Sequence, residues 1–175
     1  MILAGDIGGT KTVLALVARL PDGSITWVKE QAYPSQDYPE FDDILDVFLP
    51  PGPQLTAACF GIAGPVVNQH CQMTNLSWSL DSATLKAKFG TNQVKLLNDL
   101  EVMAIGMLHL PDHDLVELNP NALAQTGNIA VIAAGTGLGE AILYWDGGKH
   151  HLIATEDGIV ILPRKMPNKI SCWLI

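Results

Sequence analysis

A pattern of strand, glycine-rich turn and strand constrains the fold more than any other feature, because it occurs twice. Residues 2–17 read ILAGDIGGTKTVLALV, and residues 130–145 read AVIAAGTGLGEAILYW. In each segment a short apolar run of the kind found in buried strands leads into glycines, and a second apolar run follows. We therefore expect a second domain, beginning near Asn128, that is built like the first.

Apolar periodicity and turn residues elsewhere predict alternating strands and helices, which indicates an α/β fold. Strands are expected in 1–4, 12–20, 22–33, 54–64 and 93–99, and helices in 38–50, 79–90 and 100–110. Asp81 or Ser82 can cap the helix in 79–90, and Gly90 can end it. The expected domains are a first domain at 1–110, a connection at 111–127, the start of a second domain at 128–156 and a tail at 157–175.

Composition restricts the class of protein. Of the 175 residues 48% are hydrophobic and 16% are charged, so the chain can bury a sizeable core. The net charge of -8 argues against a nucleic-acid-binding surface. Three cysteines without paired spacing suggest reduced thiols and a cytoplasmic protein. Glycines and Glu140 interrupt the longest apolar run, so no membrane span is expected.

The first glycine turn has the character of a phosphate-binding loop. Glycines let the backbone approach a ligand and aim N–H groups at phosphate oxygens. Asp6 can hold Mg²⁺ there, directly or through water. The candidate nucleotide-binding residues are Gly5, Asp6, Ile7, Gly8, Gly9 and Thr10. A plain tight hairpin is the alternative interpretation.

A second glycine turn, GTGLGE at 135–140, follows the corresponding later strand. Two such turns, each at the head of a similar hairpin, suggest two loops around one polyphosphate. The candidate residues of this second loop are Gly135, Thr136 and Gly137.

Asn98 and Asp99 stand at the end of an apolar strand in LLNDLE. A carboxylate at such a strand end points into the ligand crevice of an α/β sheet and can accept a proton from an attacking hydroxyl. The alternative is that one of the two only caps the following helix.

The segment TNLSW at 74–78 offers groups that suit a sugar. The amide of Asn75 can both donate to and accept from a hydroxyl, and Trp78 could flank a sugar face. A core tryptophan beside a turn asparagine is the alternative. The five histidines show no metal-binding spacing, and no role is assigned to them.

Five segments occur in the order and approximate spacing of the bacterial glucokinase family, which the chain resembles from Ile2 to Glu156. They are GDIGGTKTVLAL, GIAGPV, MTNLSW, LLNDLEVMAIG and AAGTGLGEAIL. The family belongs to the superfamily of sugar kinases, actin and heat-shock ATPases. The resemblance implies a ribonuclease H-like, actin-type ATPase domain with a mixed sheet and flanking helices, followed by the beginning of a second similar domain.

The resemblance also implies an activity and roles for single residues. The family transfers the terminal phosphate of ATP, with Mg²⁺, to the 6-hydroxyl of glucose. By motif match Asp99 would be the catalytic base, and Asn75, Asn98 and Glu156 would hold glucose hydroxyls. The two glycine loops would bind ATP, with Asp6 near the metal. A homodimer is implied for full-length relatives.

The family pattern breaks after Glu156, where relatives continue with Gly-Gly-His and then Asp-Phe-Ala-Pro. Inserting one base after codon 158 of a back-translation with chosen synonymous codons restores Gly-His-Cys-Asp-Phe-Ala-Pro. We therefore expect that a single-base deletion shifted the frame and truncated the second domain, leaving little kinase activity. A diverged natural end and a sequencing error are the alternatives, and reading the gene across codons 155–166 separates them. A non-catalytic sugar-binding or regulatory fragment, or a kinase for another acceptor, are the competing functions.

Overall fold

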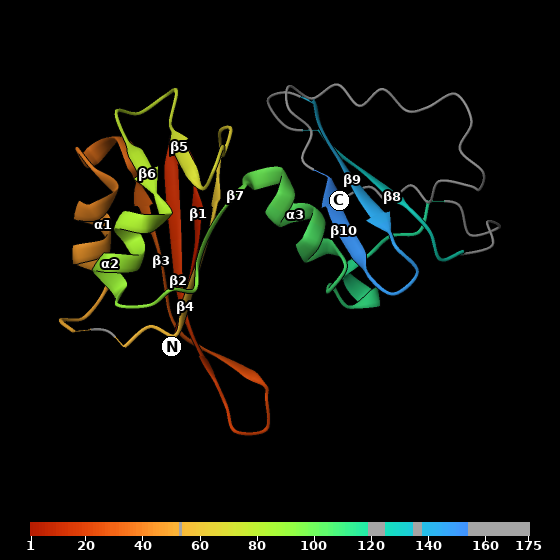
Figure 1. Cartoon of the computed structure of the whole chain (residues 1–175), viewed down its shortest axis with the longest axis horizontal. Coiled ribbons are helices and arrows are strands. Elements are labelled where there is room, and N and C mark those ends of the chain that lie inside the picture. The colour runs from red at the N-terminus through yellow and green to blue at the C-terminus, as the bar shows by residue number, and fades with distance from the viewer. Residues whose placement is uncertain (53, 119–124, 135–137, 154–175) are drawn as a thin grey trace. The chain divides into compact units, whose positions relative to one another are not determined.

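A computed structural model of the chain describes residues 1–52, 54–118, 125–134 and 138–153 (Figure 1). It divides into two compact units, Met1–Asp99 and Leu100–Ile175. The domain boundaries expected from the sequence stay predictions.

A five-stranded mixed sheet forms the centre of the first unit, in the order β3-β2-β1-β4-β7. Its strands are β1 (Ile2–Ile7), β2 (Lys11–Arg19), β3 (Ile25–Pro34), β4 (Ala57–Ile62) and β7 (Val94–Asn98). β2 is antiparallel to β1 and β3, whereas β1, β4 and β7 run parallel. The carboxyl ends of the three parallel strands therefore lie at one edge of the sheet.

Two helices, α1 (Phe41–Phe48) and α2 (Ser82–Phe89), pack on the same face of this sheet (Figure 1). The buried side chains of both helices share one apolar core with alternate residues of the strands. Its largest members that are almost fully buried are Leu3, Ile7, Leu14, Ile44, Leu45, Phe48, Phe60, Ile62, Trp78, Leu80 and Leu96. The spacing of apolar residues in the sequence predicted α1, because residues three and four apart share one helix face.

The helix ends follow from the local sequence. At the start of α1, the Asp43 carboxylate accepts the Glu40 N–H at 3.0 Å, as the third residue of a capping box does, and the Asp43 N–H donates to the Glu40 carbonyl. In α2, the Asp81 carboxylate accepts the N–H groups of the next turn, and Gly90 ends the helix with a φ of 66°. The predictions for Asp81 and Gly90 are confirmed.

A short hairpin, β5 (His70–Gln72) and β6 (Ser79–Asp81), was not expected from the sequence. The chain enters it through a reversal in which Val67 and His70 exchange backbone hydrogen bonds. The two residues between them, Asn68 and Gln69, have φ values of 51° and 62°. Positive φ at both central positions is the conformation of a type I′ turn. A 3-10 turn, η1 (Ser35–Asp37), was also not expected.

Strand β1 is longer than predicted, and this changes the place of Asp6. The sequence interpretation ended the strand at Ala4 and put Asp6 in the turn. In the structure Asp6 is paired with Val13 of β2 and Gly61 of β4. The adjacent glycines Gly8 and Gly9 come only after Ile7, and the ladder continues through Gly5 and Asp6 to that point.

The second unit contains an antiparallel sheet in the order β10-β9-β8 and helix α3 (Asp99–Met107), which begins at the last residue of the first unit. Its strands are β8 (Ile129–Ala134), β9 (Leu138–Trp145) and β10 (His150–Ile153), and a 3-10 turn, η2 (Asp112–Asp114), precedes them. Ala104 and Met107 of α3 pack on the sheet in a separate apolar core. The three strands predicted here are present, and β9 and β10 form the predicted hairpin, whereas the glycine turn predicted between β8 and β9 lies outside the described residues.

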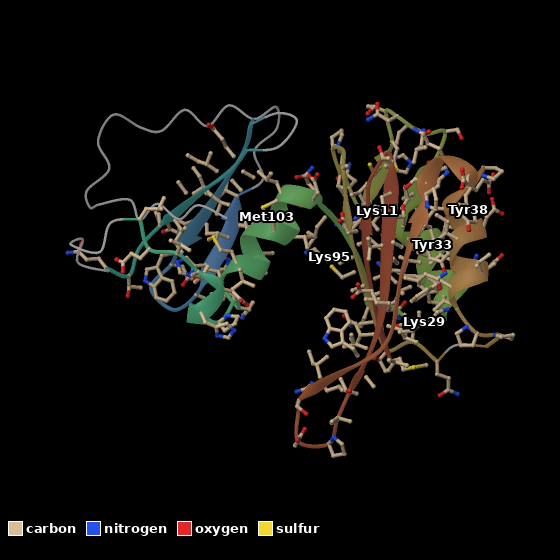
Figure 2. All side chains as sticks on the ribbon, turned by 180° about the vertical axis from the view of Figure 1, so that it is seen from behind. Lys11, Lys29, Tyr33, Tyr38, Lys95 and Met103 are labelled. Atoms are coloured by element: carbon tan, nitrogen blue, oxygen red, sulfur yellow. The ribbon has the colours of Figure 1, made fainter. Side chains whose placement is uncertain are left out.

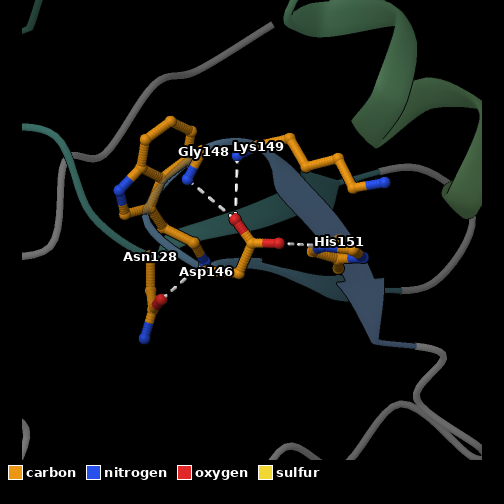
Figure 3. A network of polar contacts seen from close by, with 6 residues as sticks. Asn128, Asp146, Gly148, Lys149 and His151 are labelled. Atoms are coloured by element: carbon orange, nitrogen blue, oxygen red, sulfur yellow. Dashed lines mark hydrogen bonds and ion pairs between the residues drawn. The ribbon is translucent and has the colours of Figure 1, made fainter.

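The hairpin between β9 and β10 is held by one carboxylate (Figure 3). Asp146 accepts the N–H groups of Gly148 and Lys149 at 2.8 and 2.9 Å, and the ring nitrogen of His151 also contacts it. These hydrogen bonds lower the pKa of Asp146 far below its usual range. The network fixes a surface turn.

In the described part of the chain no helix is long and apolar enough to cross a membrane.

Candidate active site

The predicted site residues of the first unit lie at the end of the sheet where the parallel strands β1, β4 and β7 have their carboxyl ends. Ile7, Ile62 and Asn98 occupy one row across the three strands. The Ala63 N–H donates to the Ile7 carbonyl at 2.9 Å, and Asn98 Nδ2 donates to the Gly64 carbonyl at 3.0 Å. These bonds connect the segments that follow the strands. Ligands of open α/β sheets bind outside such carboxyl ends.

The first glycine turn connects β1 to β2 and is closed by a short backbone bond. The Gly8 N–H donates to the Lys11 carbonyl at 3.0 Å. A Cβ on Gly8 would stand 2.9 Å from that carbonyl oxygen, closer than side chains approach in real proteins. Only glycine therefore fits this position without a shift of the backbone.

The turn also lies directly against Asn75. A Cβ on Gly9 would stand 3.1 Å from the Cβ of Asn75 and 3.4 Å from its Nδ2. Sequence reasoning proposed Gly9 for a phosphate and Asn75 for a sugar, and they lie 66 positions apart in the chain. The fold makes them neighbours, with the Asn75 side chain exposed to solvent.

Gly5 and Ile7 have a structural reason to be where they are. A Cβ on Gly5 would stand 2.7 Å from Phe60 Cδ1 and 2.8 Å from Leu14 Cδ2, so glycine lets these core side chains close over β1. The side chain of Ile7 is fully buried in the same core. A part for either residue in nucleotide binding would have to come from its backbone and stays a prediction.

Asp6 and Asp99 are close enough for their charges to interact. Partial desolvation raises the pKa of Asp6, and the negative charge of Asp99 raises it further. The positive charge of Lys11, labelled at the start of β2 in Figure 2, acts in the opposite direction. The edge therefore gathers two carboxylates and one ammonium group beside the glycine turn.

Asn98 and Asp99 occupy the strand end that the sequence predicted. Asn98 is the last residue of β7, and Asp99 is the first residue of α3. The Asn98 amide nitrogen holds the turn after β4 through the Gly64 carbonyl. The Asp99 side chain is exposed, as a group that meets a substrate must be.

Trp78 belongs to the core and does not flank a sugar site. Its side chain is 2% exposed, its Nε1 donates to the Tyr38 carbonyl at 3.1 Å, and its ring packs against Phe41. Of the two interpretations left open by the sequence, the structural one is correct. Apolar neighbours on α1, not visible in the local sequence, decide this.

Four of the predicted site residues lie outside the described residues. They are Gly135, Thr136 and Gly137 of the second glycine turn and the sugar ligand Glu156.

The carboxylates of the site suit Mg²⁺ in its usual protein environment. Mg²⁺ is commonly held by one or two carboxylates together with substrate phosphates and waters. Asp6 and Asp99 provide two carboxylates that repel one another, and a cation would relieve this repulsion. The described residues contain no group of three or more His, Cys, Asp or Glu side chains that could form a metal site made by protein alone.

Sequence reasoning missed two buried hydroxyl residues behind the glycine turn. Ser35 donates from its Oγ to the Gly8 carbonyl at 2.7 Å, and Thr12 Oγ1 lies 2.9 Å from the same Oγ. Both side chains are fully buried. No local signal indicates them, because Ser35 is 27 positions from Gly8 and follows an edge strand.

Comparisons with known proteins identify similar chains. Residues 3–175 match the sequence model of the family described as glucokinase. A glucokinase of Nostoc sp. is 37% identical over 163 residues, which cover 90% of this chain and 47% of the relative. A glucokinase of Synechocystis sp. is 36% identical over 167 residues, with 88% and 47% covered. The chain thus spans about half the length of the relatives it matches.

Solved structures agree with the fold. The glucokinase from an Antarctic psychrotroph superposes with a TM-score of 0.77 and 27% identity, covering 94% of this chain and 52% of that one. A ROK family glucokinase from Streptomyces griseus, in complex with glucose and AMPPNP, gives a TM-score of 0.53 at 23% identity, with 90% and 47% covered. The mixed sheet with flanking helices is therefore that of the actin-type ATPase fold, as predicted.

Proposed function

Because the chain belongs to the glucokinase family, we propose that it carries residues for the ATP-dependent phosphorylation of glucose at its 6-hydroxyl. The proposal extends to a chain that spans about half the length of its relatives. Cysteines without paired spacing support a cytoplasmic setting for this reaction.

One observation carries the proposal: a bare glycine turn, an exposed amide and two carboxylates converge at the ligand-binding edge of the sheet. Gly9 lies against Asn75, and the charge of Asp99 acts on Asp6. Phosphoryl transfer needs mainly alignment and charge neutralisation, which such a set supplies. The solved Streptomyces griseus relative holds glucose and AMPPNP, and these ligands have the chemistry that the set suits.

Each residue has a distinct role in the proposed reaction. Asp99 accepts the proton of the glucose 6-hydroxyl as that oxygen attacks the terminal phosphorus of ATP. The bond between this phosphorus and the bridging oxygen breaks, and ADP leaves. Asn75, Asn98 and Glu156 hold other hydroxyls of the sugar through amide or carboxylate hydrogen bonds. The backbone amides of Gly9 and Thr10 and those of 135–137 bind phosphate oxygens, whereas the Gly8 N–H is already donated to the Lys11 carbonyl.

Asp6 would hold Mg²⁺, directly or through water, and Asp99 adds a second negative charge nearby. A bound Mg²⁺ would neutralise charge on the phosphates of ATP. The raised pKa of Asp6 supports this role, because a carboxylate that is costly to ionise alone gains from a cation.

Binding and transfer are tested separately on the same chain. In a 1H–15N NMR titration, glucose should shift the side-chain amide signals of Asn75 and Asn98, and Mg·ATP should shift the backbone signals of Gly8 and Gly9. A coupled assay detects glucose 6-phosphate. Asp99→Asn should keep the glucose affinity and lower the rate of transfer about 10²–10⁴-fold, the usual contribution of a general base.

The outcomes separate the competing functions. Glucose binding without any sugar phosphate would favour a non-catalytic sugar-binding fragment, and transfer to another sugar but not glucose would favour a different substrate. If neither ligand moves these signals and no product forms, the proposal is wrong. Val116→Ala in the second unit is the control, since Val116 is exposed and should leave binding by the first unit unchanged.

A further inference from the structure

Behind the glycine turn, three residues form a directed chain of hydrogen bonds. Ser35 Oγ donates to the Gly8 carbonyl at 2.7 Å, which uses the only proton of that hydroxyl. In the 2.9 Å contact between the two hydroxyls, Thr12 must therefore be the donor and Ser35 the acceptor. The direction runs from Thr12 through Ser35 to Gly8, and such chains strengthen their members.

The backbone of Ser35 also makes a hydrogen bond to the glycine turn, at Thr10. Its N–H donates to the Thr10 carbonyl at 3.0 Å. The carbonyls of Gly8 and Thr10 therefore both point toward Ser35, into the protein. Thr12 and Ser35 are each 0% exposed, so water does not compete for these bonds.

The orientation of the two carbonyls determines where the amides of the turn point. In a planar trans peptide the C=O and the N–H point in opposite directions. Because the Gly8 carbonyl is held inward, the Gly9 N–H of the same peptide unit points outward. In the described part of the chain this N–H has no protein acceptor. A rotated peptide would instead present a carbonyl oxygen, which repels phosphate.

We propose that Thr12 and Ser35 are positioning residues that lock the Gly8–Gly9 peptide so that its N–H meets a phosphate of ATP. This inference rests on the proposed function, because it supposes that the turn binds a nucleotide. Neither hydroxyl touches the ligand. Their effect passes through the orientation of one peptide plane.

Ser35→Ala and Thr12→Val remove the two hydroxyls, and Thr12→Ser restores one in a smaller side chain. Thr91→Val is the matched control. Thr91 Oγ1 also donates to a backbone carbonyl, that of Thr56 at 2.9 Å. Thr91 lies just before the first residue of β7, so it is at the other end of this strand from Asn98 and the site. Folding of each variant is first verified by circular dichroism and urea unfolding.

The readout is the dissociation constant for Mg·ATP, measured by titration on the whole chain. Ser35→Ala should weaken binding about five- to tenfold, the effect of one hydrogen bond of ordinary strength on the orientation of the binding group. Thr12→Val should weaken it by a smaller factor, and Thr12→Ser and Thr91→Val should change it less than about twofold.

A second readout does not need the nucleotide. The Gly9 amide should give one sharp NMR signal in the unchanged chain, and a shifted, broadened or doubled signal in Ser35→Ala. A folded Ser35→Ala variant with unchanged Gly9 signal and unchanged Mg·ATP affinity would overturn the inference alone. Failure of the wild-type chain to bind Mg·ATP would overturn the proposed function. If the Gly9 signal of Ser35→Ala were then also the same as in the wild type, the idea that Ser35 fixes the Gly8–Gly9 peptide would be wrong too.

Discussion

At the scale of single residues, the ionised Asp6 carboxylate lowers the stability of the fold, although its proposed role is to hold Mg²⁺. Desolvation and the charge of Asp99 raise its pKa above the ordinary 3.8. A carboxyl with a raised pKa in the folded state binds its proton more tightly there than in the unfolded chain. Its contribution to stability is thus fully present below pH 3.8 and is lost as the pH rises through the folded-state pKa.

Asp6→Asn should therefore raise the free energy of unfolding at neutral pH, where Asp6 is ionised. The gain should not exceed about 1 kcal/mol, because solvent screens charges that are exposed. It should shrink as the pH falls toward 3.8, as measured by urea unfolding across the pH range.

Asp22 provides a control of opposite sign. Hydrogen bonds from Ser24 lower the pKa of Asp22. Its contribution is present above pH 3.8 and is lost as the pH falls through the lowered pKa, so Asp22→Asn should destabilise the protein at neutral pH and not in acid. A gain for Asp6→Asn that stays constant into acid would contradict the electrostatic explanation.

Most of the candidate site could be named from the sequence, because glycines, carboxylates and amides at strand ends carry their chemistry in their residue type. Gly9, Asn75 and Asp99 belong to this group. Trp78 could not be decided, since an indole suits both a core and a sugar. Thr12 and Ser35 could not be found at all, because hydroxyl residues gain their meaning only from partners that are distant in sequence.

At the scale of elements, Gln69 fastens the β5–β6 hairpin to the edge of the sheet. Its Oε1 accepts the Leu96 N–H at 3.0 Å, and its Nε2 donates to the Leu96 carbonyl at 3.1 Å. Leu96 lies in β7, which has a neighbouring strand on one side only. A side-chain amide thus takes the place of a further strand, two residues before Asn98.

Gln69 does this from a left-handed backbone conformation with a φ of 62°, which non-glycine residues adopt at a cost. Gln69→Ala should lower the free energy of unfolding by about 1–3 kcal/mol, because it leaves a buried donor and acceptor on Leu96 unpaired. Gln69→Gly should recover up to about 1 kcal/mol of this by relieving the backbone. Urea unfolding gives both values.

Hydrogen exchange at the Leu96 amide identifies the origin of the effect. Exchange should accelerate in both Gln69 variants and stay unchanged in Asn68→Gly, which alters the neighbouring left-handed residue without touching Leu96. Equal unfolding midpoints for Gln69→Ala and the unchanged chain would show that the amide contributes nothing.

The long elements were predictable because their apolar residues repeat with the period of a strand or helix over many positions. The helices α1 and α2 and the five long strands of the first unit follow such patterns. Strands β5 and β6 have three residues each, which is too short for a period to appear. The contact of the Gln69 side chain with Leu96, which ties this hairpin to the sheet, can be recognised only when β7 is known to be an edge strand.

At the scale of the whole molecule, the two units have separate apolar cores. Every buried member of the first core lies between Leu3 and Leu96, and every buried member of the second lies between Ala104 and Leu143. A chain of roughly 100 residues can bury enough surface to fold as one domain. The first unit therefore contains what it needs to fold.

A chain of residues 1–99 should consequently unfold in one cooperative transition, followed by far-UV circular dichroism. Its amide NMR signals should coincide with those of the same residues in the whole chain, apart from those next to the new end. Leu85→Ala, in the first core, should lower the midpoint, whereas Lys86→Ala on the same helix should change it little. Gradual unfolding without a transition would show that the first unit depends on the second.

Because Trp78 is buried, its fluorescence can be used to follow the folding of the first unit. The indole of Trp78 is enclosed in the first core, whereas Trp27 on β3 is 67% exposed and Trp145 of the second unit is half-buried, with its ring 4.8 Å from that of His150. An enclosed indole emits at shorter wavelength than one in water. In a chain of residues 1–99, whose tryptophans are Trp27 and Trp78, blue-shifted fluorescence that resists a soluble quencher will therefore come mainly from Trp78, and its loss will mark the opening of the first core without any dye or label.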